Sequence, residues 1–374
     1  MFLSARSSGL LICGIVLILF LSLLLPLVTA APPDALAKQK PGAGRCLDGS
    51  CFQSAEDRQK LSQPVDLPAS NQSAIPAGPS PYYFIAVHNE PYHGDIGQSK
   101  KLAKAYFVLK DMVAQADRYG IRLTLMFSPP WGALIASDPA KVADLNRWAA
   151  TGHEIALHHH SIYHGGWDGY TDYTPQEAET ERLKHTKTPE PYLGTLDNMV
   201  AALVPLSGDI RSGCSNDEQD KAELPDSIVY DTCSGFLNTG TPGVFVSGQG
   251  GGKGINDFII VGNVSGIERR WVSHRMISTA ALEREAELEF SQTDSNSVFG
   301  AITHSATDQA PSTYQFLEFI HAWDPDGSHS LNLTEVFQRN IIPEVKISDE
   351  IINSHQSGKQ PRYDETVSDG CDTC

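Results

Sequence analysis

The chain has 374 residues and a formal net charge of −17, from 28 Lys and Arg against 45 Asp and Glu. Phosphate backbones bind clustered basic residues, so this balance argues against nucleic acid and favours an uncharged partner. An apolar content of 41% is enough for the buried core of one large domain or two small ones.

Residues 1–30 have the pattern of an export signal. Arg6 precedes an apolar run from Leu10 to Val28, and small residues follow up to Ala31. The run is nearly long enough to cross a bilayer, so an uncleaved membrane anchor is the alternative. Both interpretations predict a secreted or extracytoplasmic protein that meets a membrane only through this segment.

Residues 31–80 are rich in Pro, Ala, Ser and Gln and show no sustained apolar period. This composition predicts a flexible stalk with one small loop between Cys46 and Cys51. A folded domain is expected over residues 81–345, and a C-terminal tail over residues 346–374.

Cysteine spacing agrees with export. Six of the seven cysteines form close pairs, which in an oxidising compartment predict three disulfides: Cys46–Cys51, Cys214–Cys233 and Cys371–Cys374. A redox or metal pair is the alternative for the last. Three sequons predict glycosylated surface positions in a host that has the machinery: Asn71, Asn263 and Asn332.

Strand-like and helix-like segments alternate after residue 81. Early strands are expected at 82–88, 121–127 and 153–158, and later ones at 209–212, 227–231, 244–247, 258–262 and 298–304. Helices are expected at 99–119, 139–150, 189–203, 279–290 and 312–323. Repeated β–α units predict an α/β fold, a distorted (β/α) barrel of about seven to eight parallel strands with a C-terminal helical extension.

Histidines gather after the third predicted strand. Five of the 13 histidines fall between His153 and His164. Neutral imidazoles with one carboxylate are typical ligands of a catalytic Zn, with Co, Ni or Fe as alternatives, and they leave coordination positions open. A histidine-rich surface loop, or a set of hydrogen-bonded core histidines, is the alternative. In barrels of this kind the chemistry lies where strands end, as this cluster does.

The run from Gly152-His153-Glu154-Ile155 to His160-Ser161-Ile162-Tyr163-His164 resembles the polysaccharide deacetylases, carbohydrate esterases of family four. Their second motif reads His-Ser/Thr-x-x-His. The resemblance extends in element order over residues 82–343. It implies a distorted (β/α) barrel, metal-dependent removal of acetyl groups from a glycan, and His160 and His164 as metal ligands, with His158 as the substitute ligand.

Other positions are carried over by the same resemblance. Val87-His88-Asn89-Glu90 matches the first motif, which makes Glu90 the metal-ligand carboxylate and puts Asn89 in the place of the catalytic base. An amide is a poor proton acceptor, so Glu90, Asp95 or Asp168 would replace it. Three further residues match catalytic positions, with the last as general acid: Arg211, Asp231 and His304.

Past the ligands, Trp167, Asp168 and Tyr170 offer aromatic faces and a polar group for binding a sugar ring, and loop packing is the alternative for the two aromatics. Residues 324–335 have the oxygen spacing of a calcium-binding EF-hand loop. His329 occupies the position where the turn needs Gly, which favours an ordinary helix–loop–helix without Ca²⁺.

Three functions therefore compete. The first is a metal-dependent hydrolase that deacetylates a carbohydrate. The second is a non-catalytic glycan-binding or surface protein on the same fold, which Asn89 permits. The third is a hydrolase of another amide or ester.

Overall fold

The structure is a computed structural model that describes residues 79–90, 99–163, 166–185, 191–214, 223–233, 236–238, 245–247 and 253–348. They belong to a single unit, Gln72–Cys374. The predicted signal, His164, Asp95, the predicted tail beyond residue 348, and the Cys46–Cys51 and Cys371–Cys374 pairs lie outside the described residues. None of the described helices is long and apolar enough to span a membrane.

The described strands form one large sheet around β1 (Tyr82–Asn89). On one side of β1 lie β12 (Val298–His304) and the edge strand β11 (Arg275–Met276). On the other side lie, in order, β2 (Leu123–Phe127), β3 (Glu154–His158), β4 (Ser212–Cys214), β5 (Tyr230–Asp231), β10 (Ile267–Trp271), β9 (Ile259–Val264) and β14 (Glu344–Lys346). Short strands join the sheet or form a separate hairpin: β8 (Ile255–Asn256), β13 (Ser330–Leu331), β6 (Phe236–Asn238) and β7 (Phe245–Ser247).

The α/β class is confirmed, but the sheet is mixed and curls into a half-barrel. The path from β11 to β10 is parallel throughout, whereas β9 runs antiparallel to β10. A two-residue turn causes this reversal. Ser265 and Gly266 have φ of 55° and 88°, as a tight hairpin requires. Among the described residues the path ends at β11 and β14 without closing.

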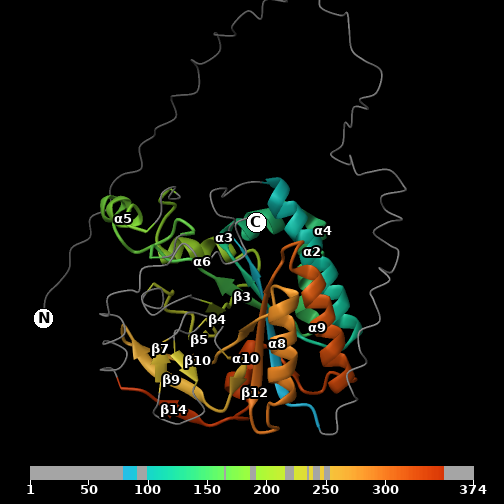
Figure 1. Cartoon of the computed structure of the whole chain (residues 1–374). Helices are drawn as coiled ribbons and strands as arrows, with labels where there is room; N and C mark the ends of the chain where they lie inside the picture. The colour runs from blue at the N-terminus through green and yellow to red at the C-terminus, as the bar shows by residue number, and fades with distance from the viewer. Residues whose placement is uncertain are drawn as a thin grey trace, which may run out of the picture. The chain divides into compact units, whose positions relative to one another are not determined.

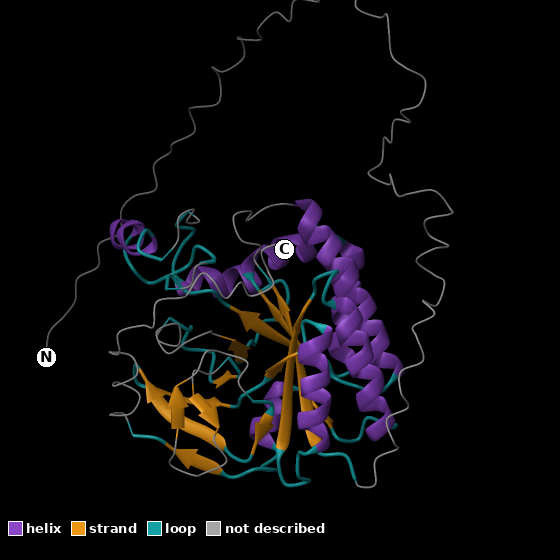
Figure 2. Cartoon of the chain, in the orientation of Figure 1, coloured by secondary structure: helices purple, strands orange, loops and turns teal. Residues whose placement is uncertain are grey.

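Most of the described helices cover one face of this sheet, where α2, α8 and α9 stand side by side in Figure 1 and Figure 2, whereas the last helix, Leu333–Gln338, packs in the core on the opposite face. The described helices are α2 (Ser99–Arg118), α3 (Pro129–Ala136), α4 (Pro139–Ala150), α5 (Pro175–Arg182), α6 (Leu196–Leu203), α8 (Ala280–Ser291), α9 (Ala310–Trp323) and α10 (Leu333–Gln338). Helix α4 has the predicted bounds because Asp138 caps it, accepting from Ala140 N, and Pro139 opens its first turn.

Alternation along β1 separates two hydrophobic cores. Tyr83, Ile85 and Val87 pack in the core beneath the helices, whereas Phe84 and Ala86 pack in the core on the opposite face. We call this second face the inner face. Side chains along a strand point alternately to the two faces, so a residue two positions after Ala86 lies on the inner face and one two positions after Val87 lies beneath the helices.

Candidate metal centre

The carboxyl ends of three strands bring four candidate residues together. His88 is the sheet partner of His304, and β3, which ends at His158, lies two strands from β1 on the side opposite β12. Following the alternation from Ala86, Ala156 and Ile302, the side chains of His88, His158 and His304 belong to the inner face. Glu90 follows His88 at the same two-residue spacing.

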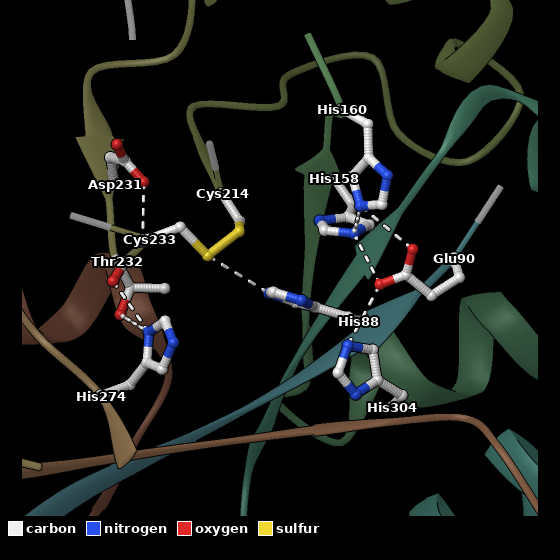
Figure 3. The surroundings of a disulfide bond; sticks show 10 residues. All are labelled: His88, Glu90, His158, His160, Cys214, Asp231, Thr232, Cys233, His274 and His304. Atoms are coloured by element: carbon white, nitrogen blue, oxygen red, sulfur yellow. Dashed lines mark hydrogen bonds and ion pairs between the residues drawn. A yellow bond between two sulfur atoms is a disulfide. The ribbon is translucent and has the colours of Figure 1, made fainter. Parts of the chain in front are cut away.

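Glu90 lies at the centre of the group (Figure 3). Its Oε1 is 3.1 Å from Nε2 of His158 and 3.1 Å from Nε2 of His304. Its Oε2 is 3.0 Å from Nε2 of His160. The two Nε2 atoms of His158 and His160 are 2.9 Å apart. The side chains of Glu90 and His304 are 14% and 11% exposed, so solvent reaches the group from their side.

Hydrogen bonds behind two rings fix which nitrogen faces Glu90. Nδ1 of His160 lies 3.0 Å from the carbonyl oxygen of Gly166, which only accepts, so Nδ1 carries a proton. Nδ1 of His304 donates in the same way to Oε1 of Gln309 at 2.8 Å. Both rings therefore turn Nε2 toward a carboxylate oxygen, and a proton or a cation must lie between these acceptors.

The pKa values follow from this crowding. Burial alone would lower the pKa of His160, but the Glu90 carboxylate outweighs burial and raises the pKa to about 9. Burial lowers the pKa of His158 to about 4. Burial would raise the pKa of Glu90, yet His160 and His158 hold it well below its usual range. In the absence of a metal ion, a proton on His160 thus compensates the Glu90 charge.

These residues fit a divalent metal ion. Donor atoms of Glu90, His158 and His160 all lie within 4.8 Å of one another. Two imidazoles with one carboxylate match the ligand types of open catalytic metal sites. The hydrogen bond from Nδ1 of His160 to the carbonyl oxygen of Gly166 orients the ring, as a backbone carbonyl commonly does for a metal-binding histidine. The sequence placed His158 as the substitute ligand, and the geometry brings it into the group, whereas His164 lies outside the described residues.

Asn89 belongs to the opposite face and not to the metal group. Its amide donates to the carbonyl oxygens of Val87 at 3.3 Å and Met126 at 2.9 Å. The side chain is fully buried. Asn89 therefore ties the end of β1 to β2 and takes no part in the metal group.

Asp168 lies beside the segment that follows β3 and carries His159 and His160. Its carboxylate accepts from Nδ1 of His159 at 2.8 Å and from the backbone nitrogens of His160 and Tyr170 at 3.2 Å each. Trp167 is only 1% exposed, packs with Ile162, and donates its indole N–H to the carbonyl oxygen of Tyr170. This arrangement is the loop-packing alternative for Trp167. Asp168 positions the backbone of His160.

The remaining sequence-predicted residues lie apart from Glu90 or in other contacts. Arg211 is exposed and precedes β4, whereas His158 and His304 are the last residues of their strands. Asp231 is buried on β5, and its Oδ1 accepts from the backbone nitrogen of Cys233 at 2.9 Å. The hydrogen bond that orients His304 is the one its Nδ1 donates to Oε1 of Gln309.

No motif in the sequence assigns His88 a role. Its ring stacks on His158 with centroids 4.0 Å apart, and its Nε2 lies 3.5 Å from Sγ of Cys233. The predicted Cys214–Cys233 disulfide is confirmed and lies on the inner face beside this ring. His274 meets His88 edge-on with centroids 6.3 Å apart. The two-residue spacing of His88 and Glu90 after a buried strand was the available signal.

The 324–335 segment is a loop whose carboxylates already accept hydrogen bonds. Asp324 accepts from the Tyr83 hydroxyl and from the backbone nitrogens of Ser328 and His329. Glu335 pairs with Arg122 at 2.6 Å and closes a capping box at the start of α10 with Asn332, one of the sequon residues. The expected helix–loop–helix is thus present.

Comparisons with known proteins give similarity in structure alone. No protein-family model and no curated protein matches the chain. A polysaccharide deacetylase structure from Mycobacterium smegmatis is 12% identical with a TM-score of 0.38, covering 71% of this chain and 93% of that one. The Xyl-CE4 domain of a xylanase from the Trinervitermes trinervoides hindgut metagenome is 10% identical with a TM-score of 0.34, covering 70% and 91%. At these identities the function is argued from the site itself.

Proposed function

We propose that this chain is a metal-dependent hydrolase that removes acetyl groups from a glycan. The observation that carries the proposal is the convergence of Glu90, His158 and His160 within 4.8 Å, with the nitrogen of His160 that binds metals turned toward the carboxylate. His158 and His160 lie in the run from Gly152 to His164, which resembles a motif of the polysaccharide deacetylases. This resemblance supports the choice of an acetylated carbohydrate as substrate.

Each residue would have a defined part. Glu90, His158 and His160 would hold one divalent cation, Zn²⁺ by ligand type. When bound, the cation supplies a Lewis acid that polarises the acetyl oxygen and activates water. Asp168 and Gly166 keep His160 in position. Nothing in this scheme requires Asn89.

His304 is the residue placed to move protons. Its Nε2 is 3.1 Å from Glu90, its Nδ1 is held by Gln309, and its side chain is 11% exposed, so the ring reaches both the site and an incoming substrate. With Asn89 turned away, Nε2 of His304 would take the proton of the attacking water and deliver it to the leaving nitrogen or oxygen.

The compartment belongs to the proposal as well. The export pattern of residues 1–30 and the buried Cys214–Cys233 disulfide support an extracytoplasmic location, since such disulfides persist in oxidising surroundings.

The test measures bound metal and acetate released from N-acetylated and O-acetylated oligosaccharides. His304→Gln should lower the rate by about 10²- to 10⁴-fold while one metal ion stays bound. His321→Gln, which changes a histidine that stacks on Tyr119, is the matched control and should keep the rate. Purified protein that binds no metal would support a non-catalytic glycan-binding protein. Bound metal without acetate release would indicate another amide or ester substrate.

A further inference from the structure

Two groups of potential metal ligands share Glu90. The first is Glu90 with His158 and His160, as described above. The second is Glu90 with His88 and His304, whose donor atoms also lie within 4.8 Å of one another. The proposed function uses only the first group as metal ligands and takes His304 from the second as its proton-transfer residue.

One oxygen of Glu90 faces His160, and the other faces both His158 and His304. Oε2 lies 3.0 Å from His160, and Oε1 lies 3.1 Å from His304. A carboxylate can bind one cation with each oxygen, and the ions of two-metal hydrolases lie about 3.5–4 Å apart. Glu90 is therefore placed as a bridge, with an imidazole nitrogen beside each end.

Hydrogen bonds fix the proton of His88 and of His304 on one ring nitrogen each, so the other nitrogen has a lone pair that can bind a cation. Nε2 of His88 lies 3.5 Å from Sγ of Cys233, and a disulfide sulfur carries no proton, so the nitrogen is the donor in this contact. Nδ1 of the neutral His88 ring then has the lone pair. In His304, Nδ1 donates to Gln309 and Nε2 has the lone pair.

The second group is also held in place before any ion binds. His88 is 4% exposed, and its ring is stacked on His158 and lies edge-on to His304 with centroids 5.3 Å apart. His88 and His304 are paired residues of neighbouring parallel strands, which fixes the spacing of their backbones. Rigid strands and packed rings are the supports that precise metal sites need.

We propose that Glu90 bridges two cation positions and that His88 and His304 form the second one. The inference rests on the proposed function for its first position. The second position binds more weakly, because a single carboxylate then serves two mutually repelling dications. An ion there occupies Nε2 of His304, which can no longer carry a proton, so the second ion inhibits the hydrolysis that the first supports.

The experiment titrates metal-free full-length protein with Zn²⁺ and follows the number of bound ions per chain. Two ions should bind in two separate steps, and acetate release should rise with the first and fall with the second. His88→Gln and His304→Gln should each remove the second step and keep the first, whereas His321→Gln should keep both. Loading with Co²⁺ should give spin coupling between the two ions in the parent protein and none in His304→Gln.

A single step that ends at one ion per chain would overturn the inference. Two steps that survive in both His88→Gln and His304→Gln would overturn it as well, because the second ion would then lie elsewhere. Circular dichroism checks that the buried His88→Gln variant folds, and the more exposed His304→Gln decides the matter if it does not. Two spin-coupled Co²⁺ ions in a protein that releases no acetate would contradict only the proposed function. Acetate release by a protein that binds a single ion at every metal concentration would contradict only the inference that Glu90 bridges two cations.

Discussion

Two regions of this chain have the composition of a cation site, the cluster around Glu90 and the loop from Asp324 to Glu335. In the loop, hydroxyl, amide and guanidinium groups of the protein donate to the carboxylates: Tyr83, Ser328 and His329 to Asp324, and Arg122 to Glu335. In the cluster, the neighbours of Glu90 are imidazole nitrogens. Those of His160 and His304 have their protons committed to Gly166 and Gln309 on the other side of the ring.

The difference between the regions is the direction of hydrogen bonding. A carboxylate that already receives protein donors has little to gain from a cation, since binding would require breaking those bonds. A carboxylate surrounded by other acceptors is unfavourable until a proton or a metal ion joins them. Residue types alone do not distinguish the two regions, whereas the partners behind each side chain do.

The largest expected effect comes from replacing the central carboxylate. Glu90→Gln should weaken metal binding by at least about 100-fold, because the only carboxylate of the donor group is lost. Glu335→Gln is the matched control and should leave the metal content of the purified protein unchanged. Equal loss in both variants would mean that the comparison between the regions is wrong.

The next effect concerns which histidines complete the site. The sequence-predicted ligands were His160 and His164, whereas the geometry joins His160 to His158 at 2.9 Å. His158→Ala and His160→Ala should each reduce bound metal to a small fraction of the parent content, measured by elemental analysis of the folded protein. If His158→Ala keeps full metal and His164→Ala loses it, the ligand set from the motif is the correct one.

Alternation along strands accounts for the part of the site that the sequence could predict. His158 and His160 share a face by spacing alone, and the same rule puts His88 with Glu90 and separates both from Asn89. Asn89 was compared with the catalytic base because the motif was aligned residue by residue. Because Val87 packs beneath the helices and side chains two residues apart share a face, Asn89 is expected on that face too, away from Glu90.

Contacts between distant segments account for what the sequence could not predict. His88 meets His304 because β1 and β12 are neighbours in parallel register across more than two hundred residues. Gln309 orients His304 only because the chain turns back at the start of α9. Strands of two residues, such as β8 and β11, have too little pattern to be recognised, and they are held by their neighbours in the sheet.

The smallest effect belongs to the loop and is one of stability. Asp324 is 2% exposed and accepts from the hydroxyl of Tyr83 at 3.0 Å and from the backbone nitrogens of Ser328 at 3.1 Å and His329 at 3.0 Å. In Asp324→Asn an NH₂ group replaces one accepting oxygen and leaves a buried donor without its bond. The free energy of unfolding should fall by about 1–3 kcal/mol, measured by urea denaturation.

Asp326→Asn provides the control for this last change. Asp326 is exposed and accepts from the backbone nitrogen of Ser328, so its replacement should alter the free energy of unfolding by no more than about 0.5 kcal/mol. Neither variant should change the metal content, because the loop carboxylates are occupied by protein donors. A calcium-dependent rise in stability that Asp324→Asn abolishes would make the loop a cation site, and the direction of hydrogen bonding would then fail to separate the two regions.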